Sequence, residues 1–599
     1  MGTAVATNRA YGTLPIILIA AVVQGGLLYA LHLSIDRDFW PATSPGVVGG
    51  LYAIAVFVPL TLQLLAAHAR ERVLWILLAA LAVAYFYFGW HYGAHVAGDP
   101  KDAVRRDDWI PAAFEMVLLW LIALPFGQMR LSSGHWRAPY EGFFGVAWRN
   151  KVLLAEAVAF TGLFWLLLFL WQELFHSLGF DFFRELFSEP IFVYPVTSLV
   201  FGGALHLIGS VERMTRVVIE QVLSVLKWLA LLAGLILALF SIALLLKLPH
   251  LVMTGERIIG AAWLLWLVAV TVLLVNAAYR DGSVFQPYPR WIGLALRAVV
   301  PLTILIALTA AYALILRVAS YGFTVERVWA FVVAGAALAY SIGYGIAAFN
   351  RTSWMGGISR VNVVVALGMI VTLSLTLTPI LSPYRIAANS QYEIILSQER
   401  AGESDGTTAI SRHDSPGYYL RYRAGRYGSQ RLEALTKLED HPRAAQIREE
   451  AQFALQMGQP PAPVSPSQVD QKLDGLVMYP QGAELEAPLR ERLRADLLRQ
   501  ELESFFAYRR KQQWGGLLVD LNGDDTQEFV LLFSDYGIVY QEAQEGWRPV
   551  GKLVPQTAEP EEEQTQALVR GEVGTIMPAW RELKVGTSVY RVRPEVQWP

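Results

Sequence analysis

Apolar runs long enough to cross a membrane recur along the first two thirds of the chain. An α-helix rises 1.5 Å per residue, so a hydrocarbon core of about 30 Å requires about 20 residues. Because lipid satisfies no backbone group and the runs lack the alternation of barrel strands, helices are the expected spanning structure. The pattern predicts about eleven membrane helices, at 13–34, 47–67, 73–94, 109–129, 152–174, 190–210, 225–247, 257–279, 292–317, 325–349 and 361–381.

Lys and Arg residues are unequally distributed between the two ends of these helices. Fifteen lie on the side of the N-terminus and nine on the other side. The positive-inside rule therefore places the N-terminus in the cytoplasm. With an odd number of spans, the region after residue 382 is then periplasmic in a Gram-negative cell. The first run is longer than a signal-peptide core and no small-residue cleavage motif follows it, so we expect it to be a retained helix.

The last third of the chain changes abruptly to charged and polar residues. We expect a membrane bundle over 1–382, a helical juxtamembrane subregion over 383–457, a Pro-rich linker over 458–468 and an α+β domain over 469–599. The expected elements are an extended piece at 418–422, helices at 429–438, 443–456 and 487–510, and strands at 516–521, 528–533 and 538–541, with later pieces near 567 and 589. The fold class is thus an α-helical polytopic membrane bundle followed by a C-terminal α+β soluble domain.

Composition narrows the functional classes. The formal charge of −2 combines +5 in residues 1–382 with −7 in 383–599, so the soluble part is acidic and nucleic-acid binding is disfavoured. The chain has no cysteine, which excludes disulfides, thiolate metal sites and a cysteine nucleophile. It also lacks a Walker loop, a dinucleotide-binding glycine fingerprint, a Gly-x-Ser-x-Gly elbow and a His-Glu-x-x-His motif. Nucleotide-driven transport and the common hydrolase mechanisms are therefore disfavoured.

Several short motifs carry a family resemblance. They are the stretches 276–282 (NAAYRDG), 288–291 (YPRW), 316–329 (LRVASYGFTVERVW), 383–391 (PYRIAANSQ), 419–422 (YLRY) and 425–428 (GRYG). Together they resemble the bacterial polytopic membrane family catalogued as domain of unknown function 4153, over roughly residues 11–440. The resemblance implies a bacterial inner-membrane protein and supplies no activity, cofactor or catalytic residue.

The best-defined motif of the soluble part is 520–528 (DLNGDDTQE), between two strand-like runs. Oxygen ligands from Asp520, Asn522, Asp524 and Glu528 would suit Ca²⁺, the one cofactor that the sequence suggests. Position 6 of the loop is Asp525 where glycine is usual, and Leu531 stands where an EF-hand has its bidentate glutamate. A hairpin turn alone explains Asn-Gly-Asp and is the favoured interpretation.

A second group of candidate ligands lies at the predicted outer ends of the helices. His91 and His95 are four residues apart on one face, and Glu173 and His176 close another helix on the same side. Glu115 begins a third helix there. A metal site or proton relay is one interpretation. Interfacial residues beside an aromatic belt are the favoured one.

Two features inside the spans have structural explanations. Glu156 lies one turn from Lys151, so we expect a local ion pair. Thr324 is expected to cap the tenth helix.

Three classes of function stay open. The favoured one is a non-catalytic envelope protein whose periplasmic domain binds or senses a protein partner, with membrane lipid around the bundle. The alternatives are a transporter or lipid translocase formed by the bundle, and a membrane enzyme acting at the outer face.

Overall fold

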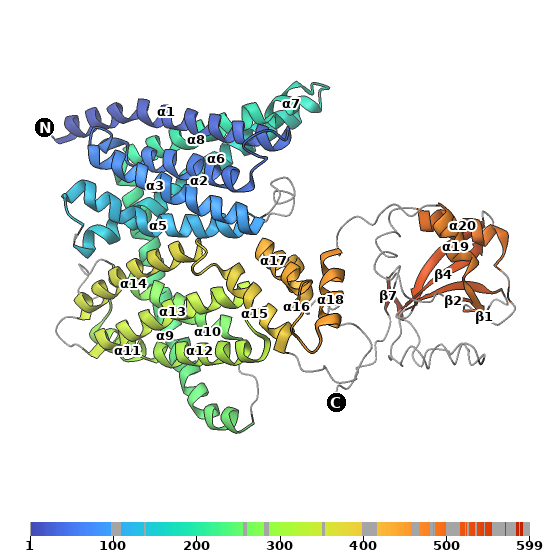
Figure 1. The fold of residues 1–599 in the computed structure, drawn as a ribbon. Helices are drawn as coiled ribbons and strands as arrows, with labels where there is room; N and C mark the ends of the chain where they lie inside the picture. Colours follow the sequence, from blue (N-terminus) through green and yellow to red (C-terminus); the bar gives the residue numbers. More distant parts are fainter. Residues whose placement is uncertain are drawn as a thin grey trace. The chain divides into compact units, whose positions relative to one another are not determined.

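The architecture follows from a computed structural model of the chain. It describes residues 2–97, 109–136, 139–254, 260–280, 287–349, 354–397, 416–456, 466–479, 483, 485–498, 515–521, 523, 526–533, 536–543, 546–553, 570, 583–585 and 588–590. Figure 1 shows a helical bundle and a smaller unit built around a sheet. By internal contacts, residues 1–397 and 412–455 form one compact unit, and 398–411 with 456–599 form the other.

The first compact unit confirms the predicted membrane bundle. Eleven helices of the described chain are long and apolar enough to span a bilayer, and each overlaps one of the expected runs. Their bounds differ from the prediction mainly because several helices continue past the apolar core. The bundle helices are α1 (Gly2–Asp36), α2 (Pro45–Leu64), α3 (Arg72–Tyr92), α5 (Ile110–Ser133), α6 (Tyr140–His176), α8 (Pro190–Ser210), α9 (Glu212–Thr254), α10 (Ala261–Tyr279), α12 (Leu302–Tyr321), α13 (Val325–Phe349) and α14 (Trp354–Thr376).

Short elements extend or connect these helices. They are the 3₁₀ turn η1 (Ala66–His68), the π-helical turn η2 (Gly93–Ala97), α7 (Phe182–Ser188) and α11 (Arg290–Val299). The η2 turn continues α3 directly, and α11 precedes α12 across Pro301, which lacks the backbone N–H that a continuous helix needs. The predicted cap of α13 is confirmed, since the Arg327 backbone N–H donates to Thr324 Oγ1 (3.3 Å).

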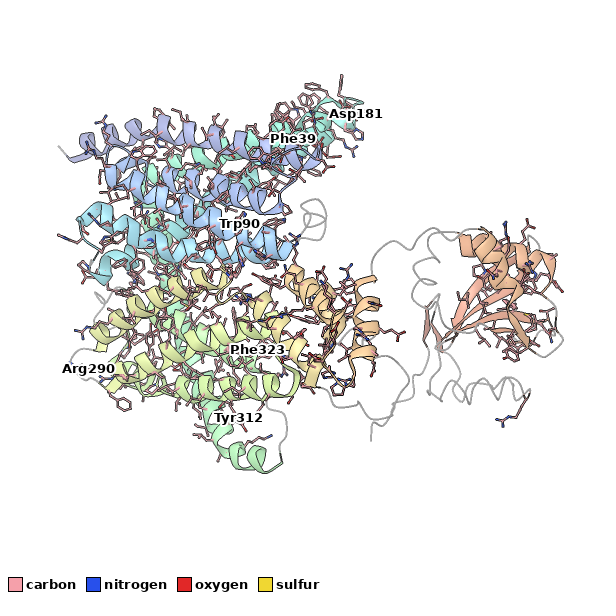
Figure 2. All side chains as sticks on the ribbon, in the orientation of Figure 1. Phe39, Trp90, Asp181, Arg290, Tyr312 and Phe323 are labelled. Carbon is pink, nitrogen blue, oxygen red and sulfur yellow. The ribbon has the colours of Figure 1, made fainter. Side chains whose placement is uncertain are left out.

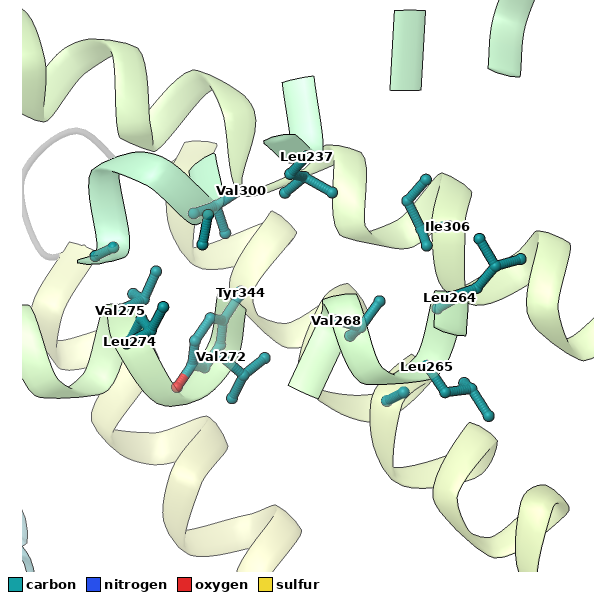
Figure 3. Packing of buried hydrophobic residues seen from close by; sticks show 14 of the residues in the cluster. Leu237, Leu264, Leu265, Val268, Val272, Leu274, Val275, Val300, Ile306 and Tyr344 are labelled. Atoms are coloured by element: carbon teal, nitrogen blue, oxygen red, sulfur yellow. The ribbon is translucent and has the colours of Figure 1, made fainter. Parts of the chain in front are cut away.

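The bundle helices form two groups, α1–α8 and α9–α14 (Figure 1). The second group has its own core, where α9, α10, α12 and α13 bury Leu237, Val268, Ile306 and Tyr344 among other apolar side chains (Figure 3). A further cluster joins the groups, because Leu373 and Leu377 at the end of α14 are buried with Leu74 and Trp120 of the first group. Helix α14 is therefore an apolar link between them, besides the packing of α9 on α6 and α8.

The close packing of α2 on α3 depends on glycines. A Cβ atom on Gly89 would lie 2.3 Å from the carbonyl oxygen of Gly49, and one on Gly49 would lie 2.4 Å from that of Gly89. A Cβ on Gly93, in η2, would lie 2.1 Å from the carbonyl oxygen of Pro45. Such small-residue contacts let membrane helices approach closely. They fix the end of α3 that carries His91 and His95.

The chain after the last span folds back onto the bundle as four helices, α15 (Pro383–Ser397), α16 (Pro416–Tyr422), α17 (Gly425–Leu435) and α18 (Ala444–Gln456). We call these four helices the cap. The expectation of an extended piece at 418–422 is wrong, because that segment is helix α16, with Leu420 buried beneath it. Tyrosine is enriched in strands, which favoured an extended piece, but tertiary packing decides for a helix.

The second compact unit is an α+β fold, as predicted. Its five-stranded sheet has the order β1-β2-β3-β4-β5, in which β1 and β2 are parallel and the remaining neighbours antiparallel. Apolar residues of two helices pack with one face of the sheet around Phe529 and Tyr540. The elements are α19 (Pro466–Asp474), β1 (Val477–Tyr479), α20 (Ala487–Leu498), β2 (Gly515–Val519), β3 (Glu528–Phe533), β4 (Tyr536–Ala543) and β5 (Gly546–Leu553), with a separate hairpin β6 (Leu583–Val585) and β7 (Ser588–Tyr590).

Candidate functional site

A small polar cavity lies where the end of α3, the start of α5 and the end of α14 meet the cap. Its lining includes His91, Glu115, Thr376, Ser382 and Tyr384. The space open to the centre of a water molecule is about 10 Å³. That is roughly the minimum for one water.

The acidic residue of the cavity is Glu115, in the second turn of α5. Its side chain is 6% exposed, and its carboxyl oxygen lies 2.5 Å from Thr376 Oγ1 of α14. This contact bridges the two groups of bundle helices. Among the described residues, no Lys, Arg or His side chain forms an ion pair with Glu115. Buried ionisable groups of this kind mark functional positions in membrane proteins more often than surface ones do.

The basic side of the cavity is His91, which is only 2% exposed. Its Nε2 lies 2.9 Å from the hydroxyl of Tyr427 on α17, and the ring also has a hydrogen bond with the backbone of Leu377. The His95 ring stacks on Tyr427, with centroids 5.4 Å apart. Tyr427 therefore contacts both histidines. Burial raises the pKa of Tyr427, so its phenol stays neutral at physiological pH.

The cap is positioned over the cavity by α17 and the π-turn. Gly425 has φ +58°, and a Cβ there would lie 2.8 Å from the carbonyl oxygen of Val96. The neighbouring Arg426 guanidinium donates to the carbonyl of Ala94 (2.9 Å). On the other side, the Tyr92 and Tyr384 hydroxyls lie 3.1 Å apart. Helix α17 thus begins against the backbone of η2.

A second set of hydrogen bonds holds the cap to the loop between α12 and α13. The backbone N–H of Val325 donates to the Tyr419 hydroxyl (2.7 Å), and that of Phe323 donates to Ser390 Oγ (2.8 Å). The Gln391 amide donates to the carbonyl of Phe323 (2.9 Å). Figure 2 shows Trp90 and Phe323 at the end of the bundle that carries the cap, with Arg290 at the opposite end.

Fourteen residues before Thr376 on α14, Asn362 belongs to a separate network of four buried or partly buried polar residues. Asn362 accepts from the Tyr344 hydroxyl (2.6 Å) and donates to Asn276 Oδ1 and to the Tyr140 hydroxyl, each at 2.7 Å. Tyr140 belongs to α6, whereas the other three residues belong to α10, α13 and α14. Helix α14 therefore makes two separate polar contacts with the first helix group, through Asn362 and through Thr376.

The predicted outer-face cluster is divided by the structure. His91 and His95 lie together, with ring centroids 5.3 Å apart. His176 instead pairs with Asp181 (2.6 Å), an exposed residue at the tip of the α6–α7 turn, well away from Trp90 in Figure 2. Within the described ranges, no three His, Asp or Glu side chains are arranged to hold a metal ion. The structure therefore does not bring Glu173 and His176 beside the histidine pair, and metal binding by these residues stays a prediction.

The predicted loop 520–528 connects β2 and β3 and forms a turn. The Gly523 backbone N–H donates to Asp520 Oδ1 (2.7 Å), and Gly523 has φ +78°. Glu528 is almost fully buried and accepts from the Leu521 N–H (2.8 Å). Asn522 and Asp524 lie outside the described residues, so calcium binding stays a prediction.

The expected ion pair inside the first helix group is wrong. Glu156 and Lys151, both of them described, form no salt bridge, and one buried oxygen of Glu156 has no hydrogen-bond partner. The Lys151 ammonium instead lies 5.6 Å from the ring centroid of Trp148. A cation over an aromatic face is an alternative to a carboxylate partner.

The sequence predicted His91 of the cavity and its neighbour His95 through their spacing, and Glu115 through its position. It gave no role to Thr376, Tyr384 or Tyr427. Tyr384 and Tyr427 belong to the motifs 383–391 and 425–428, which carried only the family resemblance. No family model, curated protein or solved structure matches the chain. The resemblance therefore stays a prediction.

Proposed function

We propose that this integral membrane protein is a non-catalytic envelope protein of the bacterial inner membrane, in which the second compact unit binds or senses a protein partner. The N-terminus is cytoplasmic and the cap and second unit are periplasmic in this proposal, as the distribution of Lys and Arg favours. The resemblance of residues 11–440 to the bacterial membrane family supports the same location.

The observation that carries the proposal is the docked cap. A passive anchor would need only a tether after the last span. Here the chain returns to the bundle and makes hydrogen bonds to η2 and to the α12–α13 loop before it continues into a separately cored α+β unit. The cap is thus a structured element of the first compact unit, and the chain continues from it into the second unit.

Removal of the second unit tests this function. The chain ending after Gln456 retains the bundle and the cap, and it should insert in the membrane but fail to restore the phenotype of cells that lack the protein. A matched chain carrying the exposed substitution Val550→Ser should restore it. Full restoration by the truncated chain would refute the proposal.

Orientation is tested separately with single cysteines in the cysteine-free chain. The substitution Ser132→Cys lies at the far end of α5 and Ser177→Cys at the far end of α6, both at exposed positions and at opposite ends of the bundle. We expect only the Ser177→Cys variant to react with a thiol reagent that does not cross the inner membrane. Labelling of the Ser132→Cys variant alone would reverse the topology.

Transport is the second candidate, and Glu115 is the observation that favours it. A buried carboxyl between two helix groups is a common element of proton-coupled transporters. Proteoliposomes carrying the intact protein and a proton-sensitive dye inside should then show flux that Glu115→Gln abolishes. Absence of proton flux across an imposed gradient, and of solute or lipid movement, counts against this function.

A further inference from the structure

The cavity between α5, α14 and the cap contains a carboxyl group in an unusual position. Glu115 is buried at the junction of three elements, and the carboxyl has the Thr376 hydroxyl as its hydrogen-bond partner. An ionised carboxylate without a cation and without water is strongly unfavourable in such a place. The group therefore needs either a proton or access to water.

Thr376 can serve both charge states of this carboxyl. Its Oγ1 lies 2.9 Å from the carbonyl oxygen of Leu373 and 3.1 Å from that of Thr372, in addition to the 2.5 Å contact with Glu115. A hydroxyl has one proton to donate and lone pairs to accept. When Glu115 is protonated, its O–H donates to Thr376, which donates to a carbonyl of its own helix. When Glu115 is ionised, Thr376 donates to the carboxylate instead.

We propose that Glu115 is a reversible proton-binding site whose occupancy controls the docking of the cap. In the release step the carboxyl O–H bond breaks, the bonding electrons stay on the carboxylate oxygen, and the proton passes to a water molecule as hydronium. Uptake is the reverse. The ligand of the cavity is thus a proton. The signal to which the protein responds is then the pH on the side of the cap, and this statement about the signal rests on the proposed sensing function.

The size of the cavity links the proton to the cap. A carboxylate oxygen is stable when several donors surround it, whereas this space holds about one water. Ionised Glu115 therefore requires the cavity to widen. Pro383 and Tyr384 of α15 line the cavity, and His91 on the opposite wall is bound to Tyr427 of α17. Widening moves the cap away from η2, and protonation lets it return.

Other titratable or charged groups surround the cavity, and the test must separate them from Glu115. Helix α3 contributes His91, Tyr92 and Tyr85, whose hydroxyl donates to the backbone carbonyl of Met116 in α5. The other described groups are His95 of η2, Tyr384 and Arg385 of α15, and Arg426 and Tyr427 of α17. The tyrosines and arginines keep their charge across neutral pH. Imidazole is the side chain whose ordinary pKa lies nearest to that range, so His91 and His95 are the groups to separate from Glu115. Protonation of these histidines at acid pH would add positive charge beside Arg426 and would loosen the cap, the opposite sign to the Glu115 effect.

Hydrogen exchange of the cap measures docking directly. In the full-length protein in lipid nanodiscs, backbone amides of 416–435 should exchange at least about tenfold faster, after correction for intrinsic rates, at about pH 8 than at about pH 5.5. Glu115→Gln mimics the protonated carboxyl and should keep the slow exchange at both pH values. Glu156→Gln, the same change at a partly buried carboxyl of the bundle, should behave like the unsubstituted protein.

Three results would overturn the proposal: exchange of the cap that is independent of pH, a pH response that survives Glu115→Gln, or faster exchange at the lower pH. If Glu115→Gln does not insert, Thr376→Val provides the second variant. It removes the hydroxyl that serves both charge states and should shift the midpoint of the exchange change, while a merely structural Thr376 would leave the midpoint in place.

The outcomes for site and function are distinguishable. The chain ending after Gln456 keeps the cavity and cap and should keep the pH response of 416–435. If it does so and also restores the cellular phenotype, the proton site stands and the proposed function fails. If the pH response is missing while the second unit is still required in cells, the proton site fails and the function stands.

Discussion

Gly425 gives the sharpest test of cap docking. Its φ of +58° lies in the left-handed region, and a side chain there would meet the Val96 carbonyl oxygen at 2.8 Å and the Val96 Cα at 3.0 Å. The conformational part of Gly425→Ala costs about 1 kcal/mol. The close approach adds a similar or larger amount, because backbone atoms on both sides must move. We expect about 2–3 kcal/mol in total, which is a ~30-fold to ~150-fold increase in cap opening.

The assay is hydrogen exchange of residues 416–435 in the full-length protein, with residues 130–136 as the internal comparison. Gly134→Ala is the matched control, since Gly134 also has positive φ (+77°) but no atom within 4 Å of the added Cβ. The control should raise exchange only locally, by about fivefold, because strain is its only cost. Equal and small effects of the two substitutions in their own segments would refute the close approach of α17 to η2.

Three further predictions concern the two units. Asn362→Leu should destabilise the bundle by about 2–3 kcal/mol, because it removes hydrogen bonds to Tyr344, Asn276 and Tyr140. The control Thr372→Val, on the same helix, should have little effect. Thermal unfolding in nanodiscs measures the difference, and equal melting temperatures of the two variants would contradict the prediction. Gly89→Ala should cost about 2–3 kcal/mol through its contact with Gly49, while Gly203→Ala, with open space around its Cβ, should be neutral in the same assay. Burial raises the pKa of Tyr540, and the charge of Asp496 is the next largest cause, so the folded unit keeps this proton after the unfolded chain has lost it. The stability of the second unit should therefore fall as pH rises above about 10. Hydrogen exchange of 528–553 measures this fall, and Tyr540→Phe should remove part of it.

The fold was largely accessible from sequence because the dominant signal is local. A stretch of about 20 apolar residues specifies a membrane helix without reference to the rest of the chain. The strand at 528–533 was located for a related reason, since a strong turn precedes it. The prediction for segment 418–422 failed because its conformation depends on packing against α15 and α17, which no local pattern contains.

The candidate site was only partly accessible for the same reason. The spacing of His91 and His95 places both on one face of a helix, and this was sufficient to bring them together. The partners of the buried groups lie far along the chain: 336 residues separate His91 from Tyr427, and 261 separate Glu115 from Thr376. Distances of that kind are set by the order in which the helices pack. Glu173 and His176 satisfied the same local criterion as His91 and His95, and tertiary packing placed them elsewhere.

Helix α14 carries two polar contacts to the first helix group, one through Asn362 and one through Thr376. Fourteen residues at 1.5 Å separate the two contacts by about 21 Å, most of the thickness of the hydrocarbon core. A continuous helix of this length moves as one rod, so its tilt cannot change at one contact alone. Substitutions at sites this far apart normally have additive effects. Because one rigid helix carries both contacts, we expect them to be interdependent, and a double-mutant cycle between Asn362 and Thr376 should show a coupling energy.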